Sequence, residues 1–166
     1  MEAMPTAPRP YHHGGLRAAL LDAADALLEA GEVSLREAAR MAGVSPAAAY
    51  RHFADKEALL AALAARHFAQ FGAALAGAGI RGQGPAYVRF ALERPGRFRL
   101  MFGPLLCRAG AHPELRAAAE AAFAALSAAA GGREAGIRAW AMVHGLAHLL
   151  LDGAIPGEVD LETLLA

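Results

Sequence analysis

Two short helical patterns meet at a glycine in residues 33–53, which read VSLREAARMAGVSPAAAYRHF. Ser34 precedes the first pattern and Glu37 follows three residues later, a spacing typical of the start of a helix. Gly43 stands where the chain must turn, because glycine takes a positive φ at little cost. The Ser-Pro dipeptide that ends at Pro46 fits the cap and the first position of a second helix. The stretch therefore predicts two helices joined by a tight turn.

The second of these helices has features that suit the major groove of DNA. Two helices joined by a short glycine-containing turn form a helix-turn-helix, whose second helix reads base edges. The small residues Ala47–Ala49 would let its backbone approach the bases, while the Tyr-Arg-His sequence of residues 50–52 could bond phosphates or bases. Ala49 and Phe53 share a face suited to packing. The alternative is an ordinary helical hairpin inside an all-α core.

The composition favours an all-α protein and gives no global basic field. Hydrophobic residues make up 56% of the 166 residues, while β-branched residues and alternating apolar and polar runs are scarce. The 16 basic and 16 acidic residues balance. Acidic residues even outnumber basic ones over residues 1–60. Any positive surface for nucleic acid must therefore come from the placement of side chains rather than from their sum.

The sequence contains no secretory signal. Residues 1–10 are rich in proline and indicate a disordered arm, and no stretch of membrane-spanning length escapes charge or glycine. Cys107 is the only cysteine, which excludes an intrachain disulfide, and its leucine neighbours predict a buried, inert thiol. We therefore expect a cytoplasmic protein that does not bind membranes.

Helical patterns flank the central stretch on both sides. One runs from Leu16 to a stop at Gly31 and would complete a three-helix domain. Asp55 fits the cap of a longer connecting helix that enters a second domain. The glycines of residues 77–85 predict a loop after it. Further helices are expected over residues 86–94, 96–102, 113–130 and 134–151, with a short turn at 160–165.

These segments resemble the DNA-binding domain of TetR/AcrR-type transcriptional repressors. The resemblance runs from about Tyr11 to Leu63. It is carried by the sequences VSLREAA, AGVSP, YRHF and DKEALL at residues 33–39, 42–46, 50–53 and 55–60. The later sequence WAMVHG, at residues 140–145, resembles the WHG-type C-terminal domain within that family. The resemblance implies a helix-turn-helix domain over residues 1–58 and a helical effector-binding and dimerisation domain over residues 59–166.

The resemblance also implies roles for individual residues at a double-stranded DNA operator. Those expected at phosphates are Ser34, Arg36, Tyr50, His52 and Lys56. Those expected near bases are Pro46, Ala47, Ala48 and Arg51, and the capping residue Ser45 is also expected to bind DNA. The chemistry agrees for most of them, since helix starts favour phosphate oxygens and arginine can bond guanine with two hydrogen bonds. Tyr50 could instead be a core aromatic residue, and His52 a helix C-terminal cap.

One domain of this size offers few DNA contacts, so the hypothesis requires a homodimer. Two copies would read half-sites about 34 Å apart, or a multiple of that distance. The helices expected at the interface, Ala117–Ala129 and Gly136–Leu151, are rich in small residues that permit close approach. The last helix is apolar nearly all round, which indicates that both of its faces are buried. Burial entirely within one subunit is the alternative.

Bulky residues of the second domain are candidates to line a pocket for a small-molecule effector that releases the repressor from DNA. They are Phe68, Phe71, Phe90, Phe98, Met101, Phe102, Phe123, Trp140 and His144. The same residues equally describe a hydrophobic core, so the pocket prediction rests mainly on the family resemblance.

The last helix also places His144, His148 and Asp152 four residues apart. Two histidines at this spacing can reach one metal ion, so a metal-responsive regulator is an alternative, although we predict no metal. No phosphate loop, carboxylate pair or nucleophile motif is present, and we predict neither an enzyme nor a cofactor. A helical ligand carrier without operator binding is the other alternative.

Overall fold

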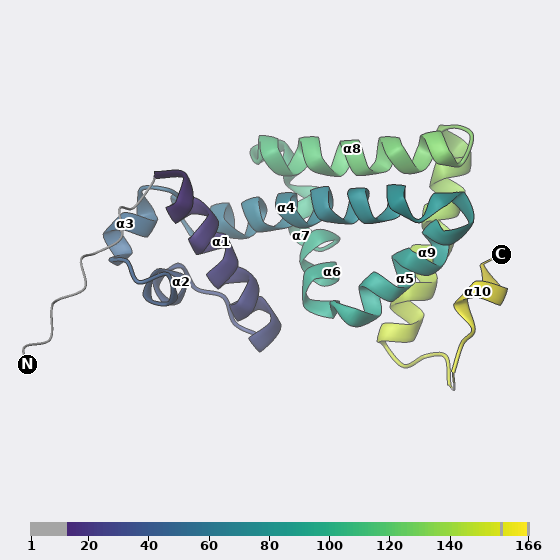
Figure 1. Cartoon of the computed structure of the whole chain (residues 1–166), viewed down its shortest axis with the longest axis horizontal. Coiled ribbons are helices and arrows are strands. Elements are labelled where there is room, and N and C mark those ends of the chain that lie inside the picture. The colour runs from purple at the N-terminus through teal and green to yellow at the C-terminus, as the bar shows by residue number, and fades with distance from the viewer. Residues whose placement is uncertain (1–12, 157, 166) are drawn as a thin grey trace, which may run out of the picture.

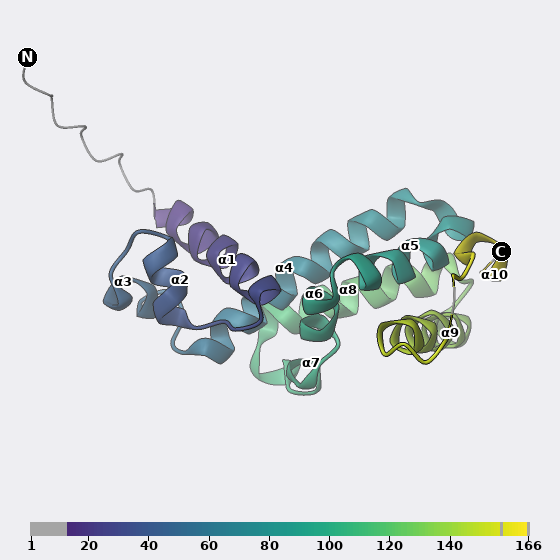
Figure 2. The same cartoon turned by 90° about the horizontal axis from the view of Figure 1, so that it is seen from below.

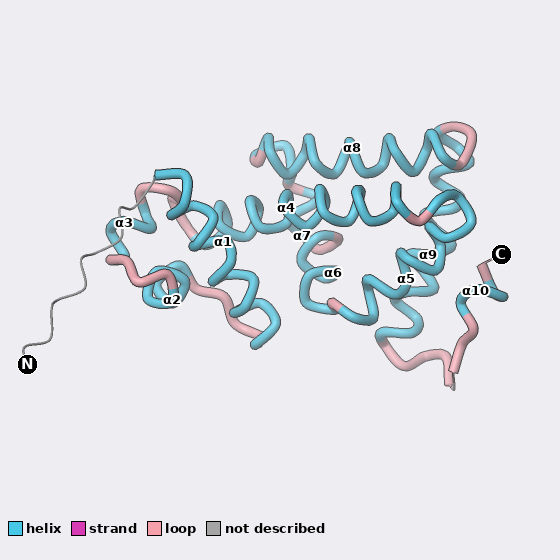
Figure 3. Tube along the Cα trace, in the orientation of Figure 1, coloured by secondary structure: helices cyan, strands magenta, loops and turns pink. Residues whose placement is uncertain are grey.

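The computed structural model describes residues 13–156 and 158–165, and this part of the chain contains helices and loops but no strand (Figure 3). The N-terminal helices are α1 (His13–Ala30), α2 (Leu35–Met41) and α3 (Pro46–Tyr50). The long helix α4 (Lys56–Gly77) runs from them into the second domain, as Figure 1 shows. The second domain adds α5 (Gly79–Glu93), α6 (Pro95–Met101), α7 (Pro104–Cys107), a 3-10 turn (Ala109–Ala111), α8 (Pro113–Ala129), α9 (Arg133–Leu151) and α10 (Leu161–Leu164). The all-α prediction is confirmed, and the predicted N-terminal arm lies outside the described residues.

The turn between α2 and α3 is a glycine-terminated Schellman motif. Gly43 has φ +70°, its N–H donates to Arg40 O, and the N–H of Val44 donates to Ala39 O. These two bonds satisfy carbonyl groups that the end of α2 would otherwise leave unpaired. Ser45 then caps α3, because its Oγ accepts the N–H of Ala48 at 3.2 Å. The turn predicted from the sequence is confirmed.

The spacing of Ser34 and Glu37 is that of a capping box, in which each side chain accepts the backbone N–H of the other residue, but this box is only half formed at the start of α2. The Oγ of Ser34 accepts the N–H of Glu37 at 3.1 Å, as expected. The Glu37 carboxylate does not reach back to Ser34 but pairs with Arg40, one turn further along the helix. This hydrogen bond lowers the pKa of Glu37 and raises that of Arg40.

Helix α4 is shared between two hydrophobic cores. Leu59 and Leu63 belong to the core of the helix-turn-helix domain, together with Ala49 and Phe53 of the α3 region. Phe68 and later residues of α4 belong to the core of the second domain. Because no loop separates the two cores, a movement of α4 in one domain is carried into the other. The division of the domains at residue 58 stays a prediction.

The second domain is built around the pair α4 and α8. These two helices lie side by side in Figure 1 and make the largest contact between any two described elements. In Figure 2, α9 is seen nearly end-on, so it runs across this pair while also packing on α5. Close contact between α8 and α9 depends on Gly136, where an added Cβ would lie 2.8 Å from Ser127 Cα.

The loop predicted over residues 77–85 is wrong. Helix α5 begins at Gly79 and includes Pro85 in its interior. Tyr87 and Val88, just after the proline, are fully buried in the second core. Tertiary packing of this face therefore outweighs the low helix propensity of glycine and proline.

Two other sequence predictions and one alternative also need correction. Helix α3 ends at Tyr50, so Arg51 and His52 lie in the turn that follows, although the N–H groups of His52 and Phe53 still bond Ala49 O. Cys107 is exposed rather than buried, because α7 is a single turn at the surface. One face of α9 is open in a single chain, where Ile137, Met142 and Leu149 are 43%, 57% and 48% exposed, so the alternative that this helix is buried entirely within one subunit is wrong.

Helix α4 also departs from the expectation that no stretch could span a membrane. By length and composition alone it is the one described helix that would be suitable, and half of its apolar window is buried within the chain. Its position between two cores accounts for that apolar composition, because it contributes buried residues to both.

Candidate DNA-binding interface

The candidate DNA-contacting residues gather at the end of the molecule formed by α2, α3 and the start of α4. The side chains of Arg36, Arg51 and Lys56 are exposed, and Tyr50 is 47% exposed. Ser45, Pro46 and Ala47 are also exposed, whereas Ser34 and His52 are half-buried. Figure 1 shows α3 at one end of the molecule and α9 near the other. These residues therefore lie at the same end of the molecule, and most of them are exposed.

Ala48 is the exception among the candidates. It is only 9% exposed and belongs to the core of the N-terminal domain, next to the fully buried Ala49. Helix α3 is so short that its inward face includes both residues. The prediction that Ala48 lies near bases is therefore wrong, and Ala47 is the alanine at the exposed surface.

Ion pairing leaves this end of the molecule more positive than the composition suggests. The acidic residues of the domain are largely held by basic partners: Asp22 by Arg66, Asp25 and Glu29 by Arg97, Glu37 by Arg40, and Glu57 by Arg108 and His112. Within the described part of the chain, no ion pair involves Arg36, Arg51 or Lys56. Their charges are therefore available to an anionic partner.

A small apolar cavity lies in the second domain, between α4, α8 and Trp140 of α9. Its volume is about 210 Å³. The predicted pocket residues that line it are Phe68, Phe71, Phe102, Phe123 and Trp140. The other lining residues are Leu75, Tyr87, Leu106, Ala119, Glu120, Ala122 and Leu126.

Four predicted pocket residues lie outside this cavity. Phe98 and Met101 are fully buried in the core, and Phe90 packs against Phe71 with ring centroids 4.9 Å apart. His144 lies behind the cavity wall, where its Nδ1 is 2.8 Å from the hydroxyl of Tyr87. The cavity exists because α8 places Ala119 and Ala122 opposite large aromatic rings. The sequence contains no local signal for the cavity, because alanines also cover the exposed side of α8 and only the packing of α4 on α8 shows which of them face the rings.

The hydroxyl of Tyr87 connects three aromatic side chains. It accepts the Nε1–H of Trp140 at 3.1 Å and lies 2.8 Å from His144 Nδ1, and the direction of this second hydrogen bond depends on the tautomer of His144. Burial, followed by the nearby His148, lowers the pKa of His144, and burial raises that of Tyr87.

These contacts disfavour a metal site on α9. In the described part of the chain no group of three histidine, cysteine, aspartate or glutamate side chains is placed to hold an ion. The Nδ1 of His144 is already hydrogen-bonded to Tyr87. His148 and Asp152 are exposed beyond it.

The fold defines a protein with an N-terminal helix-turn-helix domain and a helical C-terminal domain. Residues 20–63 match the family of bacterial regulatory proteins of the tetR family, and residues 80–166 match the tetracyclin repressor-like C-terminal domain. The chain belongs to the TetR family and is a DNA-binding transcriptional regulator.

Two solved structures are similar to this chain. One is a protein with unknown function from Rhodococcus sp. RHA1, with 32% identity, a TM-score of 0.77, and coverage of 95% of this chain and 93% of that one. The other is a TetR family transcription regulator from Marinobacter aquaeolei VT8, with 25% identity, a TM-score of 0.64, and coverage of 92% of both chains. No match was found among curated proteins.

Proposed function

We propose that this chain is a cytoplasmic transcriptional repressor that binds a palindromic operator as a homodimer and is released by a small apolar effector. It needs no cofactor or metal in this role and has no catalytic activity. The observation that carries the proposal is the set of exposed residues Arg36, Arg51 and Lys56, whose charges are unpaired within the described residues, while the nearby Glu37 and Glu57 are paired with arginines.

The candidate DNA-contacting side chains divide into two roles. Lys56 opens α4 and Arg36 lies in the first turn of α2, so both would hold phosphates, where the helix dipole adds to their charge. The Oγ atoms of Ser34 and Ser45 accept a backbone N–H, and each hydroxyl hydrogen would donate to a phosphate oxygen. Tyr50 and His52 would add one phosphate bond each. Arg51, beside Pro46 and Ala47, would reach the bases.

Two substitutions test this division of roles. Arg51→Ala should change the preferred base at one operator position, with a loss of about 1–3 kcal/mol for the best sequence. Lys56→Ala should weaken all sequences alike and lower the slope of log K against log salt by about one. Fluorescence anisotropy with matched duplexes over a salt series measures both. An equal loss across sequences for Arg51→Ala would contradict its role at the bases.

The proposed dimer interface is the open face of α8 and α9. On α9 the exposed apolar residues Ile137, Met142 and Leu149 share this face with Gly145, around which nothing lies within 4 Å of an added Cβ. On α8 the exposed residues are mostly alanine, including Ala117, Ala121, Ala124 and Ala128. Apolar faces of this kind indicate an interaction surface. In such a dimer, α8 and α9 of one subunit would pack against α8 and α9 of the other and form a four-helix contact.

A bulky charge at Gly145 tests this interface. Gly145→Arg meets no atom within the same chain, so the fold should stay intact while the dimer separates. Gly110→Arg is the matched control, because that glycine is equally open but lies away from α9. Light scattering after size-exclusion chromatography reports the mass. A wild-type chain that is monomeric at the concentration that binds DNA, or a Gly145→Arg variant that stays dimeric, would contradict the proposal.

The effector would bind in the cavity beside α4. Its wall is almost entirely apolar and rich in aromatic rings, and its volume of about 210 Å³ suits a molecule of one or two rings, since a cavity of about 150 Å³ holds benzene. The ligand would contact Phe68 and Phe71 of α4 and Phe102 at the end of α6. An effector that prefers a different position of α4 would shift the dimer away from its DNA-binding geometry.

A further inference from the structure

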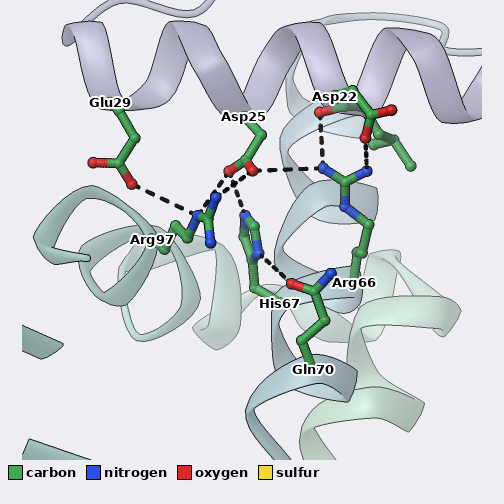
Figure 4. A network of polar contacts seen from close by, with 8 residues as sticks. Asp22, Asp25, Glu29, Arg66, His67, Gln70 and Arg97 are labelled. Atoms are coloured by element: carbon green, nitrogen blue, oxygen red, sulfur yellow. Dashed lines mark hydrogen bonds and ion pairs between the residues drawn. The ribbon is translucent and has the colours of Figure 1, made fainter. Parts of the chain in front are cut away.

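A cluster of charged side chains joins three helices from the two domains. Its centre is Asp25 of α1, whose carboxylate is 17% exposed. The guanidinium of Arg97, on α6, donates from Nε to Asp25 Oδ1 at 3.0 Å and from Nη2 to Asp25 Oδ2 at 2.6 Å. His67 of α4 is 1% exposed and has its Nε2 3.0 Å from Asp25 Oδ1. Figure 4 shows these side chains converging on Asp25.

Two further groups surround this centre. The Nε of Arg97 also lies 3.7 Å from Glu29 Oε1, one turn along α1. Arg66 of α4 donates to Asp22 Oδ1 at 2.6 Å and to Leu21 O at 3.1 Å, and it lies 3.8 Å from Asp25 Oδ2. Arg66 therefore ties α1 to α4, whereas Arg97 ties α1 to α6.

The contact between Arg97 and Asp25 constrains an angle as well as a distance. Two parallel N–H···O bonds between a guanidinium and a carboxylate hold both planar groups in one relative orientation. Both side chains are mostly shielded from water, at 22% and 17% exposure, so water competes less than at a surface pair. Ion pairs buried in this way add little net stability and are better suited to specifying one arrangement.

The backbone beside Arg97 is also in close contact with α1. An added Cβ at Gly96 would lie 3.3 Å from Leu28 O, so the first turn of α6 touches the backbone of α1. The same short helix buries Phe98 and Met101 in the second core and is followed by Phe102, which lines the cavity. Helix α6 thus connects the cavity wall to the DNA-binding domain.

We propose that the Arg97–Asp25 pair sets the orientation of the DNA-binding domain and thereby the spacing of operator half-sites that the dimer accepts. Both residues are positioning residues, since neither is among the candidate DNA-contacting residues. Figure 1 places the α1–α6 contact at the inner end of the domain and α3 at its outer end, so a small rotation at the contact displaces α3 by more. Successive base pairs are about 3.4 Å apart, so a displacement of that size changes the best spacing by one base pair.

This inference rests on the proposed function and is tested by the spacing preference of the full-length protein. A pool of duplexes would carry two inverted copies of the half-site selected by the wild type, separated by spacers of every length from zero to ten base pairs. Binding by wild type, Arg97→Gln and Arg99→Gln is measured by competition and sequencing. Arg99 is the matched control, because it is an exposed arginine on the same helix and makes no ion pair among the described residues.

The wild type should prefer one spacer length. Arg97→Gln should also bind duplexes whose spacer is one base pair longer or shorter, while it still prefers the same half-site sequence. We expect the ratio between the best spacing and the next to fall about tenfold for Arg97→Gln, the scale of one charged hydrogen-bonded contact. It should stay unchanged for Arg99→Gln. Arg97→Lys keeps the positive charge but cannot form the two parallel hydrogen bonds to Asp25, so it should give an intermediate ratio. If Arg97→Gln does not fold, Arg97→Lys provides the test.

An unchanged ranking of spacings in folded Arg97→Gln or Arg97→Lys would overturn the inference and leave the proposed repressor function intact, even if overall affinity fell. A wild type that selects no paired half-sites would overturn the proposed function, and the inference with it. A circular dichroism melt of each variant separates loss of the contact from loss of the fold.

Discussion

Removing the hydroxyl of Tyr87 should destabilise the second domain by about 2 kcal/mol. Tyr87 is 2% exposed, and its hydroxyl is the partner of both Trp140 Nε1 and His144 Nδ1. Tyr87→Phe leaves both of these nitrogen atoms without that partner. Each unsatisfied buried group costs about 1–3 kcal/mol, and the lower end applies here because Trp140 and His144 are half-buried and reachable by water.

Thermal melting followed by circular dichroism is the assay for this variant. For a chain of this length, about 2 kcal/mol corresponds to a fall in Tm of about 4–8 °C. Tyr50→Phe is the matched control, because that hydroxyl is at an exposed position, and its Tm should move by less than about 2 °C. The order of the two variants should reverse in DNA binding. Tyr50→Phe should weaken the affinity for DNA, and Tyr87→Phe should affect it less. An unchanged Tm for Tyr87→Phe would refute the assigned hydrogen bonds.

Two further predictions concern glycine packing and pH. Gly136→Ala places a Cβ 2.8 Å from Ser127 Cα and should destabilise the fold by about 1–3 kcal/mol, whereas Gly72→Ala meets nothing closer than 3.8 Å and should stabilise α4 by about 0.5–1 kcal/mol; melting curves that move in the same direction for both would contradict this. Burial lowers the pKa of His67 from 6.5, so as pH falls the unfolded chain takes up the proton first. The stability that the neutral ring contributes is thus present above about pH 6.5 and lost as pH falls through the lowered pKa. Tm should drop between pH 7.5 and 5.5, and His67→Gln should reduce that drop without abolishing it, because the pKa of His144 is lowered too; an equal drop in the variant would count against the assignment.

Local signals accounted for the helix-turn-helix. The Gly43 turn and the caps at Ser34, Ser45 and Asp55 depend on residues within five positions of each other, so a single sequence contains everything needed to predict them. Ala48 was misplaced, because a helix of five residues has no clear periodicity to separate its inner and outer faces.

Long-range packing explains what the sequence could not predict. Asp25 and Arg97 are 72 residues apart, and neither has a local pattern that points to the other. The interior position of Pro85 follows from the burial of Tyr87 and Val88 against other helices, which outweighs local propensity. The cavity likewise depends on alanines of α8 facing rings of α4, a pairing that becomes visible only when the two helices are side by side.

Selection of bound duplexes from a random pool by the wild-type protein tests the central claim most directly. The account predicts enrichment of a palindrome, with two inverted half-sites centred about one helical turn, or a multiple of it, apart. Enrichment of an unpaired site, or no enrichment over the starting pool at low salt, would contradict it.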